Sequence, residues 1–237
     1  MMMIHKVWGL GLLCISPLYL RAQSTFPEGQ IRYQADTVRR LEPHPAAYIA
    51  TQLVVYRKAG ATRLEVWRVN RHNAADTQKE IQVRNLAGTY TWVDYSDRTR
   101  AAQGNFVLFV SYQEEQQLQQ APALARSRGG YQAANVLQQL HWLGLPAERI
   151  ALAESPHNGS EVVVTKAIDL SLEAFFPAFH SLPGTALQFT YGERGWLTHY
   201  TAKALTAQPV ADALFTVDPR LQVTSLAEIG KLLSNFE

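Results

Sequence analysis

Cysteine is almost absent from this chain of 237 residues, because Cys14 is the only one. A single cysteine excludes a disulfide framework and a zinc cluster built on thiolates. Charged residues are also few, at 18%, whereas hydrophobic residues reach 47%, and this balance excludes intrinsic disorder as the overall state. With 14 glycines and 11 prolines, the chain is neither collagen-like nor elastic. Of these classes of protein, a packed globular protein is the one that the composition allows.

Motifs of common catalytic sites are missing as well. The chain contains no HExxH or HxH pair for zinc, no GxSxG nucleophile turn and no glycine-rich phosphate loop. Asp94, Asp97 and Glu114 could act as the paired carboxylates of a sugar hydrolase, but a turn at a strand end explains the first two equally well. We therefore predict no catalytic residue, no cofactor and no metal site. The histidines beyond residue 22 are isolated in sequence, and we expect them to lie on the surface or in packing positions: His44, His72, His141, His157, His180 and His199.

Residues 1–22 have the pattern of a secretory signal peptide. Lys6 provides the positive start, Val7 to Leu20 form an apolar core, and Ala22 is a small residue at the cleavage position. The alternative is an uncleaved membrane anchor, but the apolar core is shorter than the roughly 20 residues of a spanning helix, and Pro17 interrupts it. We expect an exported chain cleaved after residue 22, which leaves no cysteine and no disulfide-linked partner.

The predicted signal peptide, residues 1–22, which we also call the leader, carries part of the positive charge. The full chain has 22 Lys and Arg against 20 Asp and Glu, and the leader holds Lys6 and Arg21, so the remaining chain has 20 of each. A neutral body without a basic block is not expected to bind nucleic acid.

Most of the remaining chain has the alternating pattern of β-strands. In Gln30 to Ala35, for example, Ile31 and Tyr33 fall on one face and polar residues on the other. The segment 105–112 is apolar on both faces, so it must be covered on both sides. This predicts a curved sheet or partial barrel with something packed inside. The predicted strands are 30–35, 48–57, 62–69, 90–95, 105–112, 161–165, 187–191 and 196–205.

Helices are fewer. Ser225 and Glu228 form a capping box that begins a C-terminal helix, whose apolar side consists of Leu226, Ile229, Leu232, Leu233 and Phe236. The segment 170–179 predicts a short helix that ends near Pro177. The segment 131–143 fits either a helix or a strand, and the glutamine-rich segment 113–120 is interpreted as an exposed loop or strand edge.

Several short motifs occur in a recognisable order. They are the opening G-x-I-x-Y strand at 28–33, a hairpin at 56–65, the strand and turn at 161–166, the L-P-G segment at 182–189 and the P-V…F-x-V segment at 208–217. In this order they resemble a family of uncharacterised secreted proteins of Gram-negative envelopes, itself similar to the LolA/LolB-like lipoprotein-carrier superfamily. The family's G-Y-x-C motif is Gly130-Tyr131-Gln132-Ala133 here, so any role of that thiol is absent.

The resemblance implies an α+β fold. Residues 23–237 would form a single domain with a strongly curved antiparallel sheet, a half-open β-barrel whose concave side is closed by short helices, followed by the C-terminal helix. The segment 141–159 looks like an insertion. In the carrier relatives the cavity holds lipoprotein acyl chains, which implies a lipid acyl chain or a lipoprotein as partner. The resemblance also implies an exported protein of the periplasm or cell envelope of a Gram-negative bacterium, with possible contact with the membrane surface.

Aromatic side chains are the candidates for lining such a cavity, where each buried CH₂ of an acyl chain contributes about 0.8 kcal/mol. Each of them could equally fill the core between sheet and helices. The candidate ligand contacts are Trp67, Trp92, Phe106, Phe109, Phe189 and Trp196.

The sequence therefore predicts a non-enzymatic binding module for a hydrophobic ligand or a lipidated partner. One alternative is a peptidoglycan-associated structural protein, because residues 126–150 resemble the helix-turn-strand of OmpA-like domains. Another is a small outer-membrane barrel, although the capped terminal helix and the strands that are apolar on both faces argue against it.

Overall fold

The computed structural model describes residues 28–96, 106–120, 130–154, 160–170 and 172–234. The predicted signal peptide, with Cys14, lies outside these residues. Twelve strands of the described chain form one sheet. In order across the sheet they are β12 (Gln222–Ser225), β6 (Phe106–Ser111), β5 (Gly88–Tyr95), β4 (Asn73–Asn85), β3 (Ala61–Asn70), β2 (Tyr48–Lys58), β1 (Glu28–Arg40), β11 (Trp196–Thr206), β10 (Thr185–Glu193), β9 (Glu161–Thr165), β8 (Leu145–Glu154) and β7 (Gln132–Trp142).

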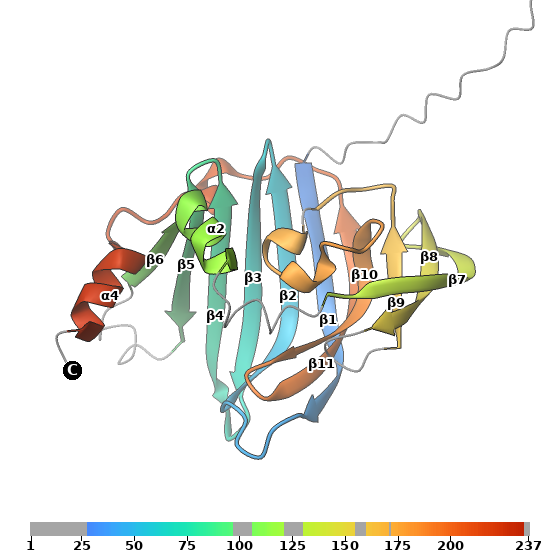
Figure 1. Ribbon diagram of the computed structural model, residues 1–237, viewed down its shortest axis with the longest axis horizontal. Helices are drawn as coiled ribbons and strands as arrows, with labels where there is room; N and C mark the ends of the chain where they lie inside the picture. Colours follow the sequence, from blue (N-terminus) through green and yellow to red (C-terminus); the bar gives the residue numbers. More distant parts are fainter. Residues whose placement is uncertain (1–27, 97–105, 121–129, 155–159, 171, 235–237) are drawn as a thin grey trace, which may run out of the picture.

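Neighbouring strands run antiparallel, apart from β12 and β6, which run parallel. The pairing of β1 with β11 joins the first strand to one from the last third of the chain. In the described chain β12 and β7 end the sheet and do not pair with each other, so the sheet is not closed into a barrel (Figure 1). The predicted large antiparallel sheet is confirmed.

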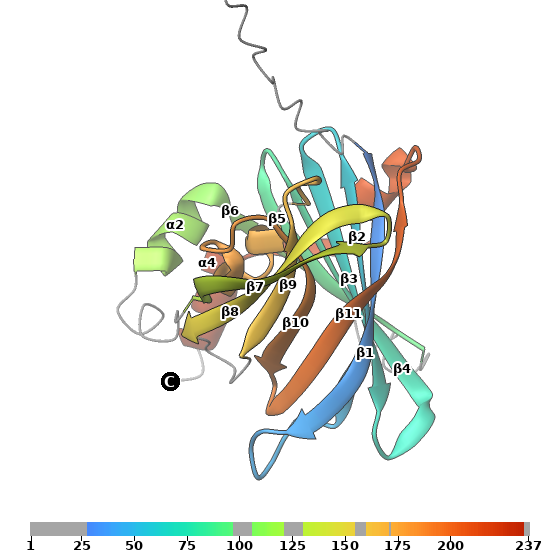
Figure 2. The ribbon, with the colours of Figure 1, turned by 90° about the vertical axis from the view of Figure 1, so that its right-hand side faces the viewer.

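The sheet is strongly curved, as Figure 2 shows for the strands from β7 to β11. Trp142 Nε1 on β7 donates a hydrogen bond of 3.0 Å to the carbonyl oxygen of Ala202 on β11. Four strand spacings separate β7 from β11, about 19 Å in a flat sheet. A tryptophan side chain is too short to cross that distance, so the β7 end must curl back towards β11.

The two faces of the sheet have different compositions. Paired residues on neighbouring strands point to the same face, so Ile31, Val55 and Leu64 lie in one row, on the side to which the sheet curls. We call this side the concave face. On the opposite, convex face the corresponding row contains Glu65, Ile81 and Trp92. The main hydrophobic core lies on the concave face, and a smaller one lies on the convex face beneath residues 215–221.

Two α-helices begin with the same capping arrangement. Glu228 accepts a hydrogen bond from the Ser225 N–H and returns one from its own N–H to Ser225 Oγ, which confirms the predicted start of α4 (Leu226–Ser234). Ser111 and Glu114 form the same box at the start of α2 (Tyr112–Gln120). The interpretation of 113–120 as a loop or strand edge is therefore wrong, because a cap and an acidic first turn stabilise a helix there.

No helix of the described chain is long and apolar enough to cross a membrane. The segment 170–179 contains two 3₁₀ turns, η1 (Leu172–Ala174) and η2 (Pro177–Phe179). Among the described residues of this segment no regular α-helix forms, and Phe176, which precedes Pro177, has φ −122° and ψ 85° outside the helical region, as expected for a residue before proline. A third 3₁₀ turn, η3 (Asp212–Phe215), lies on the convex side.

The ambiguous segment 131–143 contains strand β7, so the helix of the OmpA-like alternative is not present there. β7 is exposed along most of its length and is the last strand of the sheet. The predicted insertion at 141–159 supplies the turn and strand β8, which pairs with both β7 and β9. Within the described residues this segment is part of the sheet.

Candidate functional site

The centre of the concave face is an aromatic cluster around Phe189 on β10. Its ring centroid lies 4.8 Å from that of Phe179, 5.3 Å from Tyr200, 5.6 Å from Tyr33 and 6.0 Å from Phe176. Phe189 is 1% exposed. Side chains therefore fill the curved sheet at this point.

Much of this filling comes from η1, η2 and their neighbours, residues 172–182, which we call the cover segment. Leu172, Phe176, Phe179 and Leu182 are buried against the sheet, and both views place η1 and η2 on its concave side (Figures 1 and 2). Two backbone hydrogen bonds of 2.9 Å, from Phe176 N to Leu172 O and from Phe179 N to Phe176 O, shape its turns. The cover segment thus depends on buried side chains more than on regular helix.

Polar contacts also attach the cover segment to the rest of the described chain. Tyr131 N donates to Ala178 O at 2.9 Å, and Arg84 Nη1 donates to Ala174 O at 3.2 Å. Beyond its C-terminal end, Gly184 has φ +151°, and a Cβ there would lie 2.4 Å from Thr165 O. The return of the chain into β10 therefore requires glycine.

A buried ion-pair network lies on the same face. Arg68, whose side chain is 2% exposed, contacts both Glu193 oxygens through Nη1 and Nη2, at 2.7 and 2.9 Å. Glu80 lies 3.3 Å from Arg68 and 2.8 Å from Arg194. Burial opposes the charge of Arg68, but its hydrogen bonds and attraction to Glu193 outweigh that effect and raise the pKa of Arg68. Two arginines and two glutamates thus balance their charge here, with Arg68 buried and Arg194 exposed at the β10–β11 turn.

The six aromatic residues predicted as ligand contacts do not meet in one place. Trp67, Trp92 and Phe109 share the convex face by register. Lys79 Nζ lies 5.1 Å from the Trp67 ring centroid, and Phe109 packs on Tyr90 at 4.7 Å. Trp92 is 6% exposed and belongs to the convex core.

The other three are dispersed. Phe106 is 55% exposed on β6, and Phe189 is buried in the concave core. Trp196 Nε1 donates to Ala46 O at 2.8 Å, beside the β10–β11 turn. Of the six, only Phe189 lies in the concave core.

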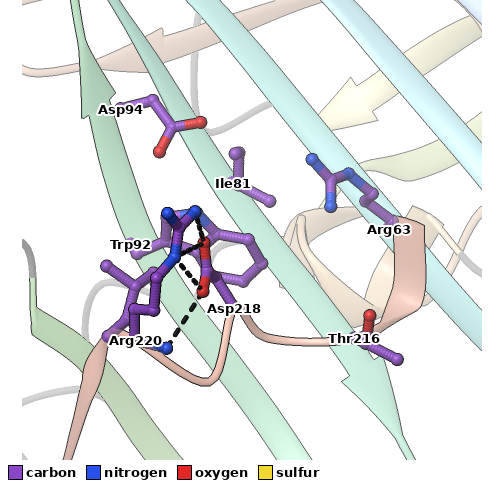
Figure 3. Close-up of a pocket in the computed structure, with 8 residues that line it drawn as sticks. Arg63, Ile81, Trp92, Asp94, Thr216, Asp218 and Arg220 are labelled. Carbon is purple, nitrogen blue, oxygen red and sulfur yellow. Dashed lines mark hydrogen bonds and ion pairs between the residues drawn. The ribbon is translucent and has the colours of Figure 1, made fainter. Parts of the chain in front are cut away.

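A hollow of about 490 Å³ opens on the convex face, between strands β3–β5 and residues 216–221 (Figure 3). We call it the convex hollow. Arg63 enters from β3, with its guanidinium carbon 5.5 Å from the Trp92 ring centroid. The lining residues are Arg63, Ile81, Trp92, Asp94, Thr216, Asp218, Arg220 and Leu221.

Ion pairs hold the charged groups of this hollow. Arg63 Nη2 lies 2.6 Å from Glu65 Oε1, and Arg63 Nη1 donates to Leu214 O at 2.6 Å. Asp94 lies 3.7 Å from Lys79. Arg220 binds Asp218 through Nε and Nη2, at 3.0 and 2.6 Å. The sequence did not predict this grouping of Arg63, Asp218 and Arg220, because Arg63 is about 150 residues from the other two and the motif that contains it describes a hairpin rather than a site.

Replacement of Arg220 by glutamine should raise the pKa of Asp218. The pKa of Asp218 is lowered from 3.8 to about 2, mainly by hydrogen bonds from the Arg220 side chain and secondly by the Arg220 backbone N–H. In the folded protein the carboxylate is therefore favoured, and its stabilising contribution, complete above pH 3.8, is lost as the pH falls towards 2.

In Arg220→Gln the pKa should move part of the way back to 3.8, since the backbone hydrogen bond remains. A carboxyl ¹³C NMR titration measures it, and Arg71→Gln, at a distant arginine, should leave the Asp218 value unchanged. An unchanged value in Arg220→Gln would show that the ion pair does not form in solution.

A second hollow, of about 360 Å³, is lined in part by His199. The sequence predicts that this histidine lies on the surface or in a packing position. Its Nδ1 lies 3.0 Å from Thr190 Oγ1 and its Nε2 lies 3.0 Å from Gln188 Nε2. Both ring nitrogens of His199 therefore have a polar side chain within hydrogen-bond distance. Burial lowers the pKa of His199 and outweighs attraction to Asp36.

The carboxylates considered for sugar hydrolysis have separate roles. Asp94 lines the convex hollow, Glu114 caps α2, and Asp97 lies outside the described residues. In the described part of the chain, no three His, Cys, Asp or Glu side chains are grouped so that they could hold a metal ion. A comparison of the sequence with protein-family models found no match, and a comparison with curated proteins found none either.

Proposed function

We propose that this chain is a non-enzymatic binding protein of the cell envelope that takes an acyl chain, free or on a lipidated partner, onto its concave face. The observation that carries this proposal is the concave core itself. In the described part of the chain, the apolar core of a curved, open sheet is covered in part by a short segment of 3₁₀ turns. This arrangement is consistent with the LolA-like half-barrel that the sequence motifs resemble.

The ligand would replace the cover segment. Phe176 and Phe179 occupy the apolar space that an acyl chain needs, so binding and covering are mutually exclusive. Each CH₂ transferred to this surface contributes about 0.8 kcal/mol, which offsets the exposure of the two rings once the chain is long enough. 3₁₀ turns also have poorer hydrogen-bond geometry than an α-helix, which favours opening here.

A fluorescent fatty acid tests this proposal directly. The probe is 11-(dansylamino)undecanoic acid, titrated into the purified chain, with palmitate as the competitor. We expect saturable binding that palmitate reverses. Phe179→Ala weakens the cover segment, so the binding-competent population increases and the apparent affinity should rise at least tenfold.

Phe106→Ala removes an equally large but exposed ring and is the matched control, for which the affinity should stay the same. Circular dichroism establishes that each variant remains folded. If the folded wild type binds no probe and Phe179→Ala binds none either, the proposal is wrong. If Phe179→Ala is folded but binds more weakly than the wild type, the cover segment is part of the site and is not displaced.

A further inference from the structure

We infer that the convex hollow is a binding site for a neutral sugar of one or two rings. It lies on the opposite face of the sheet from the proposed acyl site and is independent of it. Its volume of about 490 Å³ is in the range of small-molecule sites. Five of its eight lining residues are polar or charged, so it does not suit an acyl chain.

The charges of the hollow favour a neutral ligand. Arg63 and Arg220 balance Asp94 and Asp218, and each of these groups already has an oppositely charged partner within 3.7 Å. A charged ligand, or an amino acid zwitterion, would have to break one or more of these ion pairs. A hydroxyl group does not, because it can use the donors and lone pairs that the ion pairs leave free.

Several N–H donors and carboxylate lone pairs in the hollow are left free by the ion pairs. Arg63 uses three of its five N–H groups on Glu65 and Leu214, and Arg220 uses two side-chain N–H groups on Asp218. Each carboxylate keeps lone pairs beyond its ion pair. Leu221, which is half-buried, offers apolar contact at the side of the hollow, and the buried Ile81 and Trp92 form its base. A sugar ring has hydroxyl edges and C–H faces that fit both kinds of wall.

An NMR titration of the ¹⁵N-labelled chain tests the inference. The probes are methyl-β-glucoside, N-acetylglucosamine and maltose, with glucuronate, glucosamine and glycine as charged comparisons. We expect at least one neutral sugar to shift the indole N–H signal of Trp92, assigned with Trp92→Phe, with a millimolar dissociation constant several-fold lower than that of any charged probe.

Arg220→Gln and Asp218→Asn should each weaken this binding about tenfold. Both positions are on the exposed rim, with side chains 87% and 37% exposed, so the fold is expected to persist. Arg71→Gln is the matched control, because Arg71 lies over another tryptophan, Trp196, at 5.8 Å, and it should leave sugar binding unchanged. The inference fails if no neutral sugar shifts the Trp92 signal, if a charged probe binds more tightly, or if Arg71→Gln weakens binding as much as Arg220→Gln.

Discussion

Phe189→Ala should lower the free energy of unfolding by about 3–5 kcal/mol. Phe189 is 1% exposed and its ring packs against those of Tyr33, Phe176, Phe179 and Tyr200. Alanine leaves a cavity between the sheet and the cover segment, and Tyr33 and Tyr200 are held on their own strands β1 and β11, so they cannot close it from the sheet side. Domains are typically stable by only about 5–15 kcal/mol, so this loss is a large part of the total.

Urea unfolding followed by far-UV circular dichroism measures the effect. Phe106→Ala removes the same atoms from a position that is 55% exposed, and its unfolding free energy should stay within about 0.5 kcal/mol of the wild type. Equal losses in the two variants would mean that Phe189 does not occupy the core that this structure assigns to it.

Arg68→Ala should be comparably destabilising, by about 3–5 kcal/mol. Arg68 is buried, and its guanidinium contacts both oxygens of Glu193 and one oxygen of Glu80. Its removal leaves Glu193 partly buried without its partner, and an unpaired buried charge costs more than the ion pair contributes. A second substitution, Glu193→Gln, removes that charge and should recover part of the loss.

The matched control is Arg220→Ala. Arg220 also contacts both oxygens of one carboxylate, that of Asp218, but its side chain is 87% exposed, and exposed ion pairs contribute little. Its unfolding free energy should lie within about 1 kcal/mol of the wild-type value. If the double variant Arg68→Ala with Glu193→Gln is less stable than Arg68→Ala alone, the unpaired charge is not the cause of the loss.

Local patterns predicted most of the strands. Alternation in β1 and β10 and short apolar runs in β2, β6 and β9 were among the signals, and β3, β5 and β11 were predicted as well, since such patterns are a property of a few adjacent residues. Strand β4 was missed, because most of its residues are polar and only Ile81 and Val83 carry the pattern. β7 and β12 gave no clear signal either, since both are largely exposed.

The two capping boxes show the limit of reading one motif at a time. Ser225 and Glu228 were recognised because an apolar helical pattern follows them, whereas Ser111 and Glu114 precede a run of glutamines with no apolar face. The hydrogen bonds are the same in both places. The S-x-x-E spacing was therefore the signal that could have predicted α2.

The sequence by itself determined the β-rich composition of the fold, most strand positions and the capped C-terminal helix, because these depend on neighbours along the chain. Only the tertiary structure decided which side chains meet. Phe189 faces the cover segment because the sheet curls. Arg63 shares a hollow with Asp218 and Arg220 because residues 214–221 return across strands formed about 150 residues earlier. Contacts over such distances depend on strand order and curvature, which no short stretch of sequence encodes.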